Sequence, residues 1–583
     1  MLVTHQRAGV PQFAVLGEFI GRGSATARVV GPGADGRQRL YVEYVVYPSA
    51  IDLVAYDVDS GDYRVWSLPG GNAWAMEFGA DGRLYLGAGE GHLWRLCPRT
   101  GALDDLGGAV PGEQMIWALS PGPDGLLYGG THPSAHLFVC DPASGALSDV
   151  GRMSERNQYN HDICAAPDGW VYCGLGCERA EIIAYHPATG ARRSLLPEAL
   201  SCPGFARVYR GEDGGAYVSL SGVHLRLCDG RAVEMPAAMP ARSRTRLADG
   251  REAREPGTYP GNALGIHAVA AGPDGKIYAS SILPEYLLQY DPASGVCANL
   301  GLIPGAEAYA LLPAHDRLFI ASYTGTTLQV YDPARPFNPG RQRIPTPPDA
   351  ERGNNPANYG PLAAHQDRPF DMVMGADGRI YVGCVAGYGY RDGAIAWYDP
   401  ATDTTGFALN PLKDQGVMAL CPLPDGRLAC GTSTLCGGVP PTTTEGQLFL
   451  WDPRTRAMAS AAIVPMPGMP EITNLALGGD GLLYGSAITE LFVVDPRTMQ
   501  VLSCVSSPQS HIRRQGMLTL EDGRVVALAG PMAIFVSYVD GAWRLEEFAR
   551  FDDGWPWVGK AVLGDYLYAG SGSKLIRCAI PGL

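Results

Sequence analysis

The sequence predicts an all-β protein, a β-propeller of about twelve four-stranded blades arranged as two rings. Three observations lead to this prediction. An Asp-Gly turn recurs from one end of the chain to the other, an Asp-Pro turn follows it within six of the twelve units, and no long stretch has a helical period. Gly and Pro are abundant, at 76 and 47 of 583 residues, which suits many short strands joined by tight turns.

An aspartate marks the first turn of each unit. Ten of the twelve aspartates are followed by Gly, which supplies the positive φ that a tight hairpin needs. Most spacings between them are 42 to 48 residues, which is the length of one propeller blade. The twelve are Asp35, Asp81, Asp124, Asp168, Asp213, Asp274, Asp316, Asp377, Asp425, Asp480, Asp522 and Asp565.

One unit shows how the strands of a blade are expected to run. Residues 472–504 predict the four strands Ile472–Leu477, Leu482–Ser486, Glu490–Val494 and Met499–Cys504. An Asp-Gly turn joins the first two strands. An Asp-Pro turn joins the last two, because Pro fixes φ at the second position of the turn. Each unit is therefore expected to form one antiparallel sheet.

Twelve blades exceed the four to eight that are typical of one ring, so two rings are expected. The last unit ends after its third strand, and a spare strand-like run, Gln12–Ile20, precedes the first unit. If that run completes the last blade, both chain ends share a ring. The predicted division is 12–236 with 506–583 (blades 1–5 and 11–12), and an inserted ring at 261–505 (blades 6–10). A tandem division into 1–240 and 261–583 is the alternative.

Charge and composition limit which partners and which cellular compartment are expected. The formal net charge is −14 and no Lys/Arg-rich block occurs, so neither nucleic acid nor a membrane is an expected partner. No apolar run is long enough to span a bilayer, and the first residues lack the pattern of a secretory signal. The fourteen cysteines are scattered singly, which favours reduced thiols. These features predict a cytoplasmic protein, and they leave an oligosaccharide or a small molecule as the expected class of ligand.

The position seven residues before each turn aspartate is the candidate functional column. The first strand of a propeller blade lies nearest the central channel, so this column is expected at the channel mouth where the strand enters. It reads Arg28, Trp74, Trp117, His161, Ala206, His267, Tyr309, Phe370, Met418, Thr473, Gln515 and Val558.

Two histidines of this column are the strongest candidates for chemistry, because the chain has only 11. Imidazole titrates near neutral pH and ligates first-row metals, so His161 and His267 are candidate general bases or metal ligands. The alternative is that each only bonds the backbone of a neighbouring blade. Tyr159 and Tyr309 are further candidates for the base.

A polar loop precedes the column residue Phe370. Within it, Arg368 is a candidate to hold a carboxylate bidentately and His365 to relay a proton. The alternative is a solvated loop that only joins two blades.

Aromatic residues of the column are candidates for binding a sugar ring. Trp74 and Trp117, with Phe370, are a candidate stacking platform, or else a hydrophobic plug of the channel. The predicted division places Trp74, Trp117, Tyr159 and His161 in one ring, and His267, Tyr309, His365 and Arg368 in the other.

The repeat, with PDGxxY and YDPxTG in its blades, resembles propellers of the streptogramin-lyase and gluconolactonase/regucalcin type and the propeller polysaccharide lyases. In such lyases a histidine near the ring face acts as base or metal ligand in β-elimination, and the resemblance implies this role for His161 and His267. It implies a lyase acting on uronate-containing oligosaccharides, with a divalent metal ion as the cofactor to be considered. A non-catalytic propeller that binds a glycan or a protein is the alternative, and a lactonase-like activity is a third.

Overall fold

Four-stranded antiparallel sheets follow one another along almost the entire chain. The structure is a computed structural model, and it describes residues 2–5, 10–46, 50–70, 73–340, 350–507, 511–556 and 558–583. Twelve sheets of four or five strands are present, together with a two-stranded pair of β3 (Ile20–Gly21) and β24 (Asn262–Ala263). The predicted multi-bladed β-propeller is confirmed.

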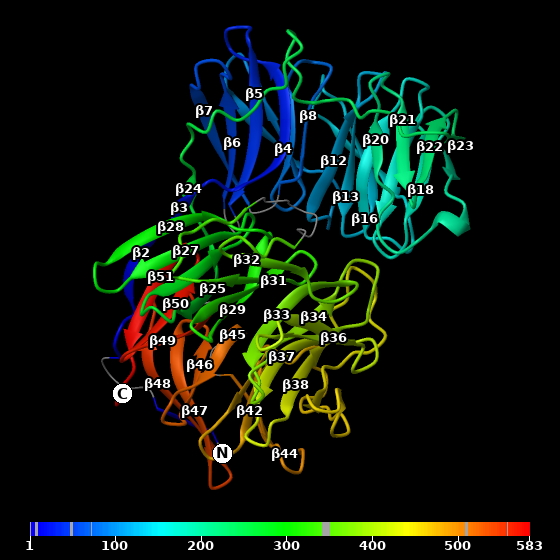
Figure 1. Ribbon diagram of the computed structural model, residues 1–583. Helices are drawn as coiled ribbons and strands as arrows, with labels where there is room; N and C mark the ends of the chain where they lie inside the picture. The colour runs from blue at the N-terminus through cyan, green and yellow to red at the C-terminus, as the bar shows by residue number, and fades with distance from the viewer. Residues whose placement is uncertain are drawn as a thin grey trace. The chain divides into compact units, whose positions relative to one another are not determined.

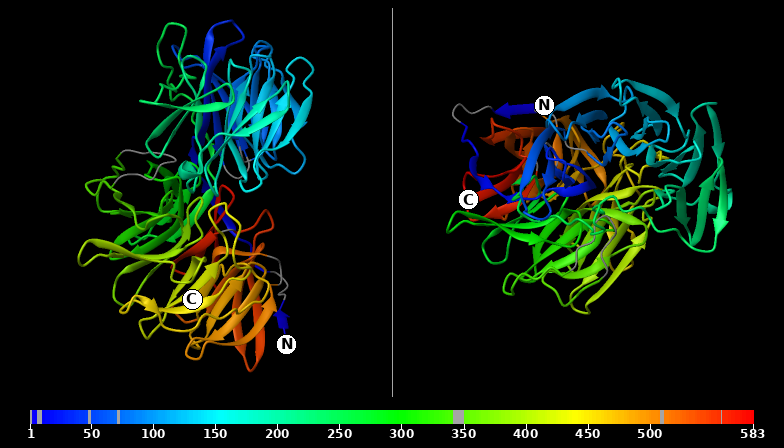
Figure 2. Two further views of the ribbon diagram at one scale, coloured as in Figure 1. Left: turned by 90° about the vertical axis from the view of Figure 1, so that its right-hand side faces the viewer. Right: turned by 90° about the horizontal axis from the view of Figure 1, so that it is seen from above.

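The chain forms two compact units, which we call unit 1 (Met1–Gly21 with Ala263–Leu583) and unit 2 (Arg22–Asn262). Figure 1 shows unit 2 in blue to green and most of unit 1 in green to red, and Figure 2 shows both from two further sides.

Unit 2 contains five sheets. Their first strands, β4, β8, β12, β16 and β20, contact one another in this order. The strands are β4 (Ser24–Pro32), β5 (Gln38–Val46), β6 (Ala50–Tyr56), β7 (Tyr63–Pro69), β8 (Ala75–Phe78), β9 (Leu84–Ala88), β10 (His92–Leu96), β11 (Leu103–Gly108), β12 (Met115–Pro121), β13 (Leu127–His132), β14 (His136–Cys140), β15 (Leu147–Arg152), β16 (Tyr159–Ala165), β17 (Val171–Gly176), β18 (Glu181–His186), β19 (Ala191–Ser194), β20 (Val208–Arg210), β21 (Ala216–Leu220), β22 (Val223–Cys228) and β23 (Arg231–Met235). A 3₁₀ turn, η1 (Glu198–Leu200), precedes β20.

The first and last sheets of unit 2 are joined by the irregular segment that follows β23. The Arg242 amide donates a hydrogen bond to the Arg210 carbonyl (2.8 Å), and the Val30 amide donates one to the Arg244 carbonyl (2.8 Å). The Arg210 guanidinium donates to Ser120 Oγ (2.8 Å) and to the carbonyls of Pro121 and Ala165 (3.1 and 2.9 Å). One side chain of β20 thus ties together the ends of β12 and β16.

Unit 1 contains seven sheets that close a ring. The first strands contact one another in the order β25, β29, β33, β37, β41, β45 and β49, and β49 contacts β25 again. The strands are β25 (Ile266–Ala271), β26 (Ile277–Ser281), β27 (Tyr286–Asp291), β28 (Val296–Leu302), β29 (Glu307–Ala314), β30 (Arg317–Tyr323), β31 (Thr327–Tyr331), β32 (Ala357–Pro361), β33 (Gln366–Met374), β34 (Ile380–Ala386), β35 (Ala394–Asp399), β36 (Thr404–Leu409), β37 (Gly416–Pro422), β38 (Leu428–Ser433), β39 (Leu448–Asp452), β40 (Ala457–Met458), β41 (Asn474–Leu477), β42 (Leu483–Ala487), β43 (Glu490–Asp495), β44 (Gln500–Ser506), β45 (Ile512–Thr519), β46 (Val525–Ala529), β47 (Met532–Val539), β48 (Ala542–Arg550), β49 (Val558–Leu563), β50 (Tyr566–Ser571) and β51 (Lys574–Ala579).

The N-terminal residues complete two sheets of unit 1. Strand β2 (Ala14–Glu18) pairs antiparallel with β51 and supplies the missing fourth strand, as predicted for that run. In Figure 1 this blue strand lies beside the red C-terminal ones. Strand β1 (Leu2–His5) pairs in parallel with β48.

The observed units differ from the preferred division, and the tandem alternative of 1–240 and 261–583 differs from them in placing residues 1–21 with the first five sheets. The sheets after residue 506 pack with those at 266–506 and not with the first five, since β45 contacts β41 and β49 contacts β25. The error has a physical cause. The closing strand β2 belongs to unit 1 while the chain directly after Gly21 belongs to unit 2, so closure of the last sheet does not require the first five sheets in the same ring.

The recurring sequence code is explained by one local network. In seven blades the tyrosine four residues after the turn aspartate donates its hydroxyl to that carboxylate, as Tyr128 does to Asp124 (2.5 Å) and Tyr484 to Asp480 (2.6 Å). The other carboxylate oxygen accepts the backbone amide two residues on, as in Leu126 to Asp124 (3.1 Å). The glycine between them has a positive φ, +82° at Gly125. Each such tyrosine is buried between sheets, so the code fixes turn and core together.

No helix within the described ranges is long and apolar enough to cross a membrane.

Candidate functional site

The candidate column coincides with a β-bulge in the first strand of the blades. The register of the first two strands shifts at Trp117, His161, His267, Tyr309, Phe370 and Met418, each of which is the extra residue of its strand. A bulge leaves one residue unpaired and re-aims its side chain. In these six blades the column therefore marks one structural feature, the bulge of the first strand. In the first blade the bulge lies at Thr26 and not at Arg28, because that blade has a longer first hairpin.

The column residues of unit 2 stack on one another. The rings of Trp74 and Trp117 lie 5.0 Å apart at 25°, and those of Trp117 and His161 lie 4.9 Å apart at 21°. His161 also contacts Phe205 of the next blade, at 4.9 Å. Because Trp74 and His161 come from the blades on either side of Trp117, they cover its two faces. This packing leaves Trp117 little ring face for a sugar.

Tyr159 is part of the same aromatic packing. It is buried, and its ring contacts Trp117 (5.6 Å), Phe205 (5.5 Å) and His132 (4.1 Å). His161 Nδ1 lies 3.3 Å from Asp162 Oδ2, and Arg207 Nε lies 2.8 Å from the same oxygen. The carboxylate of Asp162 is thus already neutralised by an arginine.

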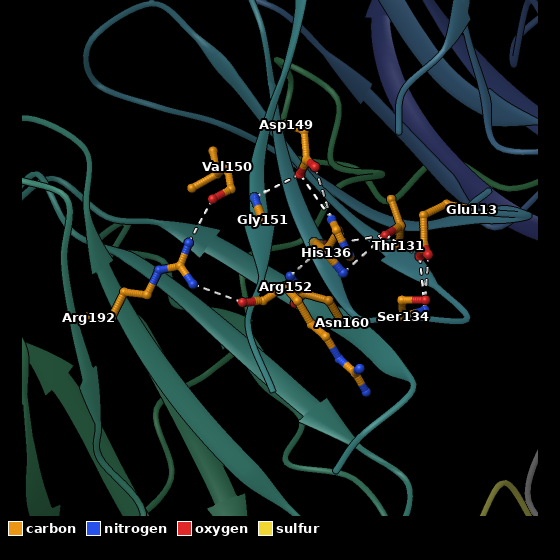
Figure 3. Close-up of polar contacts among 10 residues, drawn as sticks. All are labelled: Glu113, Thr131, Ser134, His136, Asp149, Val150, Gly151, Arg152, Asn160 and Arg192. Atoms are coloured by element: carbon orange, nitrogen blue, oxygen red, sulfur yellow. Dashed lines mark hydrogen bonds and ion pairs between the residues drawn. The ribbon is translucent and has the colours of Figure 1, made fainter. Parts of the chain in front are cut away.

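A polar network fixes the strand that carries Tyr159 and His161 (Figure 3). The side-chain amide of Asn160 donates to the His136 carbonyl (3.1 Å), and His136 Nδ1 lies 3.0 Å from Asp149 Oδ1. Figure 3 also shows Glu113, whose carboxylate accepts Thr131 Oγ1 (2.6 Å). The bond from Asn160 joins two neighbouring blades, and the other two lie within one blade.

In unit 1 the column residues of three consecutive blades meet edge to face. The rings of His267 and Tyr309 lie 4.9 Å apart at 88°, and those of Tyr309 and Phe370 lie 4.8 Å apart at 87°. His267 and Tyr309 are partly exposed, and Phe370 is buried. We call these three residues, with Arg368, Arg514 and Glu307, the arginine cluster.

Two arginines distinguish this cluster from the aromatic stack of unit 2. The Arg368 guanidinium lies between two tyrosine rings, 4.8 Å from the centre of Tyr323 and 5.5 Å from that of Tyr388. Its nearest carboxylate is Asp367, at 3.7 Å. The Arg514 guanidinium lies 4.0 Å from the centre of the Phe370 ring. Within the described part of the chain, Arg514 has no carboxylate at ion-pair distance.

Burial sets the protonation of the cluster. It lowers the pKa of His267 to about 4, and the charge of Arg514 acts in the same direction. It raises the pKa of the Tyr309 hydroxyl above its usual range, an effect that the neighbouring Glu307 increases. It also raises the pKa of Glu307, against the opposing charge of Arg368 and a hydrogen bond from Tyr309. At neutral pH the cluster therefore holds a neutral imidazole beside a protonated phenol and two guanidinium cations.

His365 lies apart from these ring contacts. It is exposed, and its imidazole stacks on Tyr390 at 4.1 Å and 18°. Its carbonyl accepts the Gly387 amide (2.7 Å), which ties the loop to the same blade.

The structure therefore separates the candidate residues into two groups. His267, Tyr309, Arg368 and Phe370 meet in unit 1, with His365 on the same blade as Phe370. Trp74, Trp117, Tyr159 and His161 meet in unit 2. Sequence reasoning missed Arg514, Glu307, Tyr323 and Tyr388. A signal existed for Arg514, because it stands one residue before the column position Gln515. Within the described residues, no three His, Cys, Asp or Glu side chains come together as a metal site.

The chain matches no known family model and no curated protein sequence. Solved structures with a similar fold include the extracellular domain of a putative hybrid two-component system from B. thetaiotaomicron, at 12% identity, a TM-score of 0.39, and coverage of 96% of this chain and 68% of that one. PorZ, a bacterial surface component of the type-IX secretion system of Porphyromonas gingivalis, has 12% identity, a TM-score of 0.38, and coverage of 97% and 87%. A chain of the mitotic checkpoint complex has 13% identity, a TM-score of 0.40, and coverage of 54% and 87%.

The predicted cytoplasmic location is not supported by these neighbours. Those from B. thetaiotaomicron, which cover nearly the whole chain, are extracellular domains. The prediction rested on scattered cysteines and on the pattern of the first residues, and neither feature is specific to one compartment.

Proposed function

We propose that unit 1 is a carbohydrate-active propeller that binds a uronate-containing oligosaccharide at the arginine cluster and cleaves it by β-elimination. The observation that carries this proposal is Arg514, a guanidinium stacked on Phe370 without a described ion-pair partner. A guanidinium held on an aromatic face is well placed to bind a carboxylate with two parallel hydrogen bonds. Arg368, held between Tyr323 and Tyr388, supplies a second cation of the same kind.

The neighbouring residues have the protonation that β-elimination requires. Arg514 and Arg368 bind the uronate carboxylate and stabilise the negative charge that develops when the adjacent carbon loses its proton. The neutral imidazole of His267 accepts that proton. The electron pair then forms a double bond to the next ring carbon, as the bond from that carbon to the glycosidic oxygen breaks. Tyr309, protonated at neutral pH and 4.9 Å from His267 between ring centres, donates a proton to the leaving oxygen.

The aromatic stack of unit 2 has no part in this proposal. Its rings cover one another, and the carboxylate of Asp162 already pairs with Arg207. A metal ion is also left out, because no described group of ligands is in place for one.

A pair of matched substitutions tests the proposal. Oligogalacturonate is incubated with the wild-type protein, with His267→Ala and with His161→Ala, and the unsaturated product is followed by its ultraviolet absorbance. We expect His267→Ala to lower the rate by roughly a hundredfold or more, and His161→Ala, which removes the same side chain from unit 2, to leave it unchanged. A third outcome is that the wild-type protein binds the ligand, Arg514→Gln binds it more weakly, and no product forms. The protein is then the non-catalytic glycan-binding alternative.

A further inference from the structure

A recessed pocket of about 330 Å³ lies in unit 2, on the sheet that β4, β5, β6 and β7 form (Figure 1). We call it the first-blade pocket. Tyr41 of β5, Ala55 of β6 and Arg64 of β7 lie opposite one another in register, and all three line it. Ala55 has the smallest side chain of this row, so the row is hollow at its centre.

The first-blade pocket has an apolar floor and a charged rim. Tyr41, Ala55 and Pro98 are buried and form the floor. Alternate residues of a strand face the same side of its sheet. The lining residues two positions from those of the central row therefore face the pocket as well, and the charged ones are Arg39, Asp57 and Asp62.

The two arginines that line the pocket differ in their partners. Arg39 Nη2 lies 2.8 Å from Asp35 Oδ2, and Arg39 Nη1 lies 3.2 Å from Asp57 Oδ2. The Arg64 guanidinium instead lies on the ring of Trp66, 4.6 Å from its centre. Among the described residues, no carboxylate is at ion-pair distance from Arg64. Its N–H groups are therefore available to a ligand in the pocket.

An acceptor stands beside this donor. Asp62 lies two residues before Arg64 and faces the same side of the sheet, yet these two side chains form no ion pair. The Ser60 hydroxyl donates to Asp62 Oδ2 (2.9 Å), and Oδ1 has no hydrogen bond within the described part of the chain. A carboxylate and a guanidinium side by side fit two neighbouring hydroxyl groups, one of which donates to Asp62 while the other accepts from Arg64.

The charge and size of the pocket favour a neutral ligand. Three carboxylates and two guanidiniums line it, so its net charge is negative and an anionic sugar is disfavoured. The hydroxyl groups of a neutral sugar can pair with both signs of charge, and its C–H groups can pack on the apolar floor. The volume is at the small end of the range for ligand pockets, about 300 to 1,000 Å³, which suits one or two sugar rings.

We propose that the first-blade pocket binds one or two residues of a neutral sugar, with adjacent hydroxyl groups on Asp62 and Arg64. The site binds and does not react. It is independent of the proposed function, because it lies in unit 2 and shares no residue with the arginine cluster of unit 1.

Binding of neutral glycosides to the full-length protein tests this proposal. Methyl galactoside, methyl glucoside, methyl mannoside and cellobiose are titrated and followed by saturation-transfer NMR. We expect at least one of them to bind, and both Arg64→Gln and Ala55→Leu, which fills the pocket, to weaken binding by roughly tenfold or more. Arg231→Gln is the matched control, because Arg231 is an exposed arginine in the last sheet of unit 2. Binding by none of the four ligands, or undiminished binding in Ala55→Leu, would overturn the proposal.

The Arg514→Gln variant separates this site from the arginine cluster. It should bind the neutral glycoside as the wild type does, whatever becomes of the proposed lyase. Loss of glycoside binding in Arg514→Gln would place the sugar in unit 1 and contradict the proposal. In the same variant, methyl galactoside should bind more tightly than galacturonate. The reverse order would contradict the assignment of a neutral ligand.

Discussion

Lys560 and Asp371 face each other across the seven-sheet ring, with Nζ 2.7 Å from Oδ1. They are separated by 189 residues in sequence. The side chain of Asp371 is 7% exposed and that of Lys560 is 29% exposed, so the pair is largely shielded from water. It connects strands of two different sheets, β33 and β49.

Removing the cation from this pair is expected to destabilise unit 1. Lys560→Met leaves the buried carboxylate of Asp371 without its counter-charge and should lower the free energy of unfolding by roughly 2 kcal/mol. Denaturant unfolding followed by tryptophan fluorescence measures the change. The double variant Lys560→Met/Asp371→Leu should recover part of the loss, since it removes both charges. A single variant as stable as the wild type would show that the pair contributes no net stability.

The pKa of His267 predicts a pH dependence of stability. Burial lowers it from 6.5 to about 4, so in this range the unfolded chain binds a proton that the folded protein does not. The contribution of His267 to the free energy of unfolding is constant above pH 6.5. On acidification from 6.5 towards 4 the free energy of unfolding should fall by at most about 1.4 kcal/mol per pH unit. Tyr309 and Arg514 are the titratable or charged groups that act on this imidazole.

The measurement is the pH dependence of unfolding in His267→Gln, which has no titrating ring and should lose this part of the slope. His511→Gln is the control, because His511 is exposed in the same unit. An identical slope in wild type and His267→Gln would contradict the assignment.

Arg514 is expected to dominate ligand affinity. Arg514→Gln removes one guanidinium from the carboxylate site and should weaken trigalacturonate binding by roughly tenfold to a hundredfold, the value of one charge-assisted hydrogen-bonded pair. Arg454→Gln makes the same change of charge at an exposed turn of unit 1, where Arg454 pairs with Asp452 (3.2 Å). Equal weakening in both variants would indicate a non-specific effect of charge.

Arg210 provides the corresponding test for unit 2. Arg210→Met removes hydrogen bonds to Ser120, Pro121 and Ala165 and should lower stability by roughly 2 kcal/mol, because the released carbonyls lie between sheets. Binding and turnover at unit 1 should be unchanged. A loss of turnover without loss of folded protein would place unit 2 in the reaction.

The blades were predictable because the residues that specify each blade lie close together in the sequence. An Asp-Gly turn and the tyrosine four residues later form one hydrogen-bonded network, so each blade is encoded within its own residues. The candidate column was predicted for a related reason. It falls at a bulge set by the same hairpin, at a fixed distance from the turn.

Relations between distant segments were not predictable in the same way. Arg514 contacts Phe370 because the ring closes with seven sheets. The N-terminal residues belong to unit 1 because strand β2 pairs with β51. Trp117 and His161 of unit 2 occupy bulges equivalent to those of His267, Tyr309 and Phe370 in unit 1, and in unit 1 the cation of Arg514 reaches the aromatic ring at the bulge. The repeat in the sequence contains no pattern that predicts this difference.

The central claim is that unit 1 eliminates across a uronate held by Arg368 and Arg514. The most direct test is the formation of an unsaturated uronate from trigalacturonate, followed by ultraviolet absorbance, with wild-type, Arg454→Gln and Arg514→Gln proteins. The account predicts product from the first two and a rate lower by roughly tenfold or more in the third. No unsaturated product from any of the three, or equal rates in all of them, would contradict it.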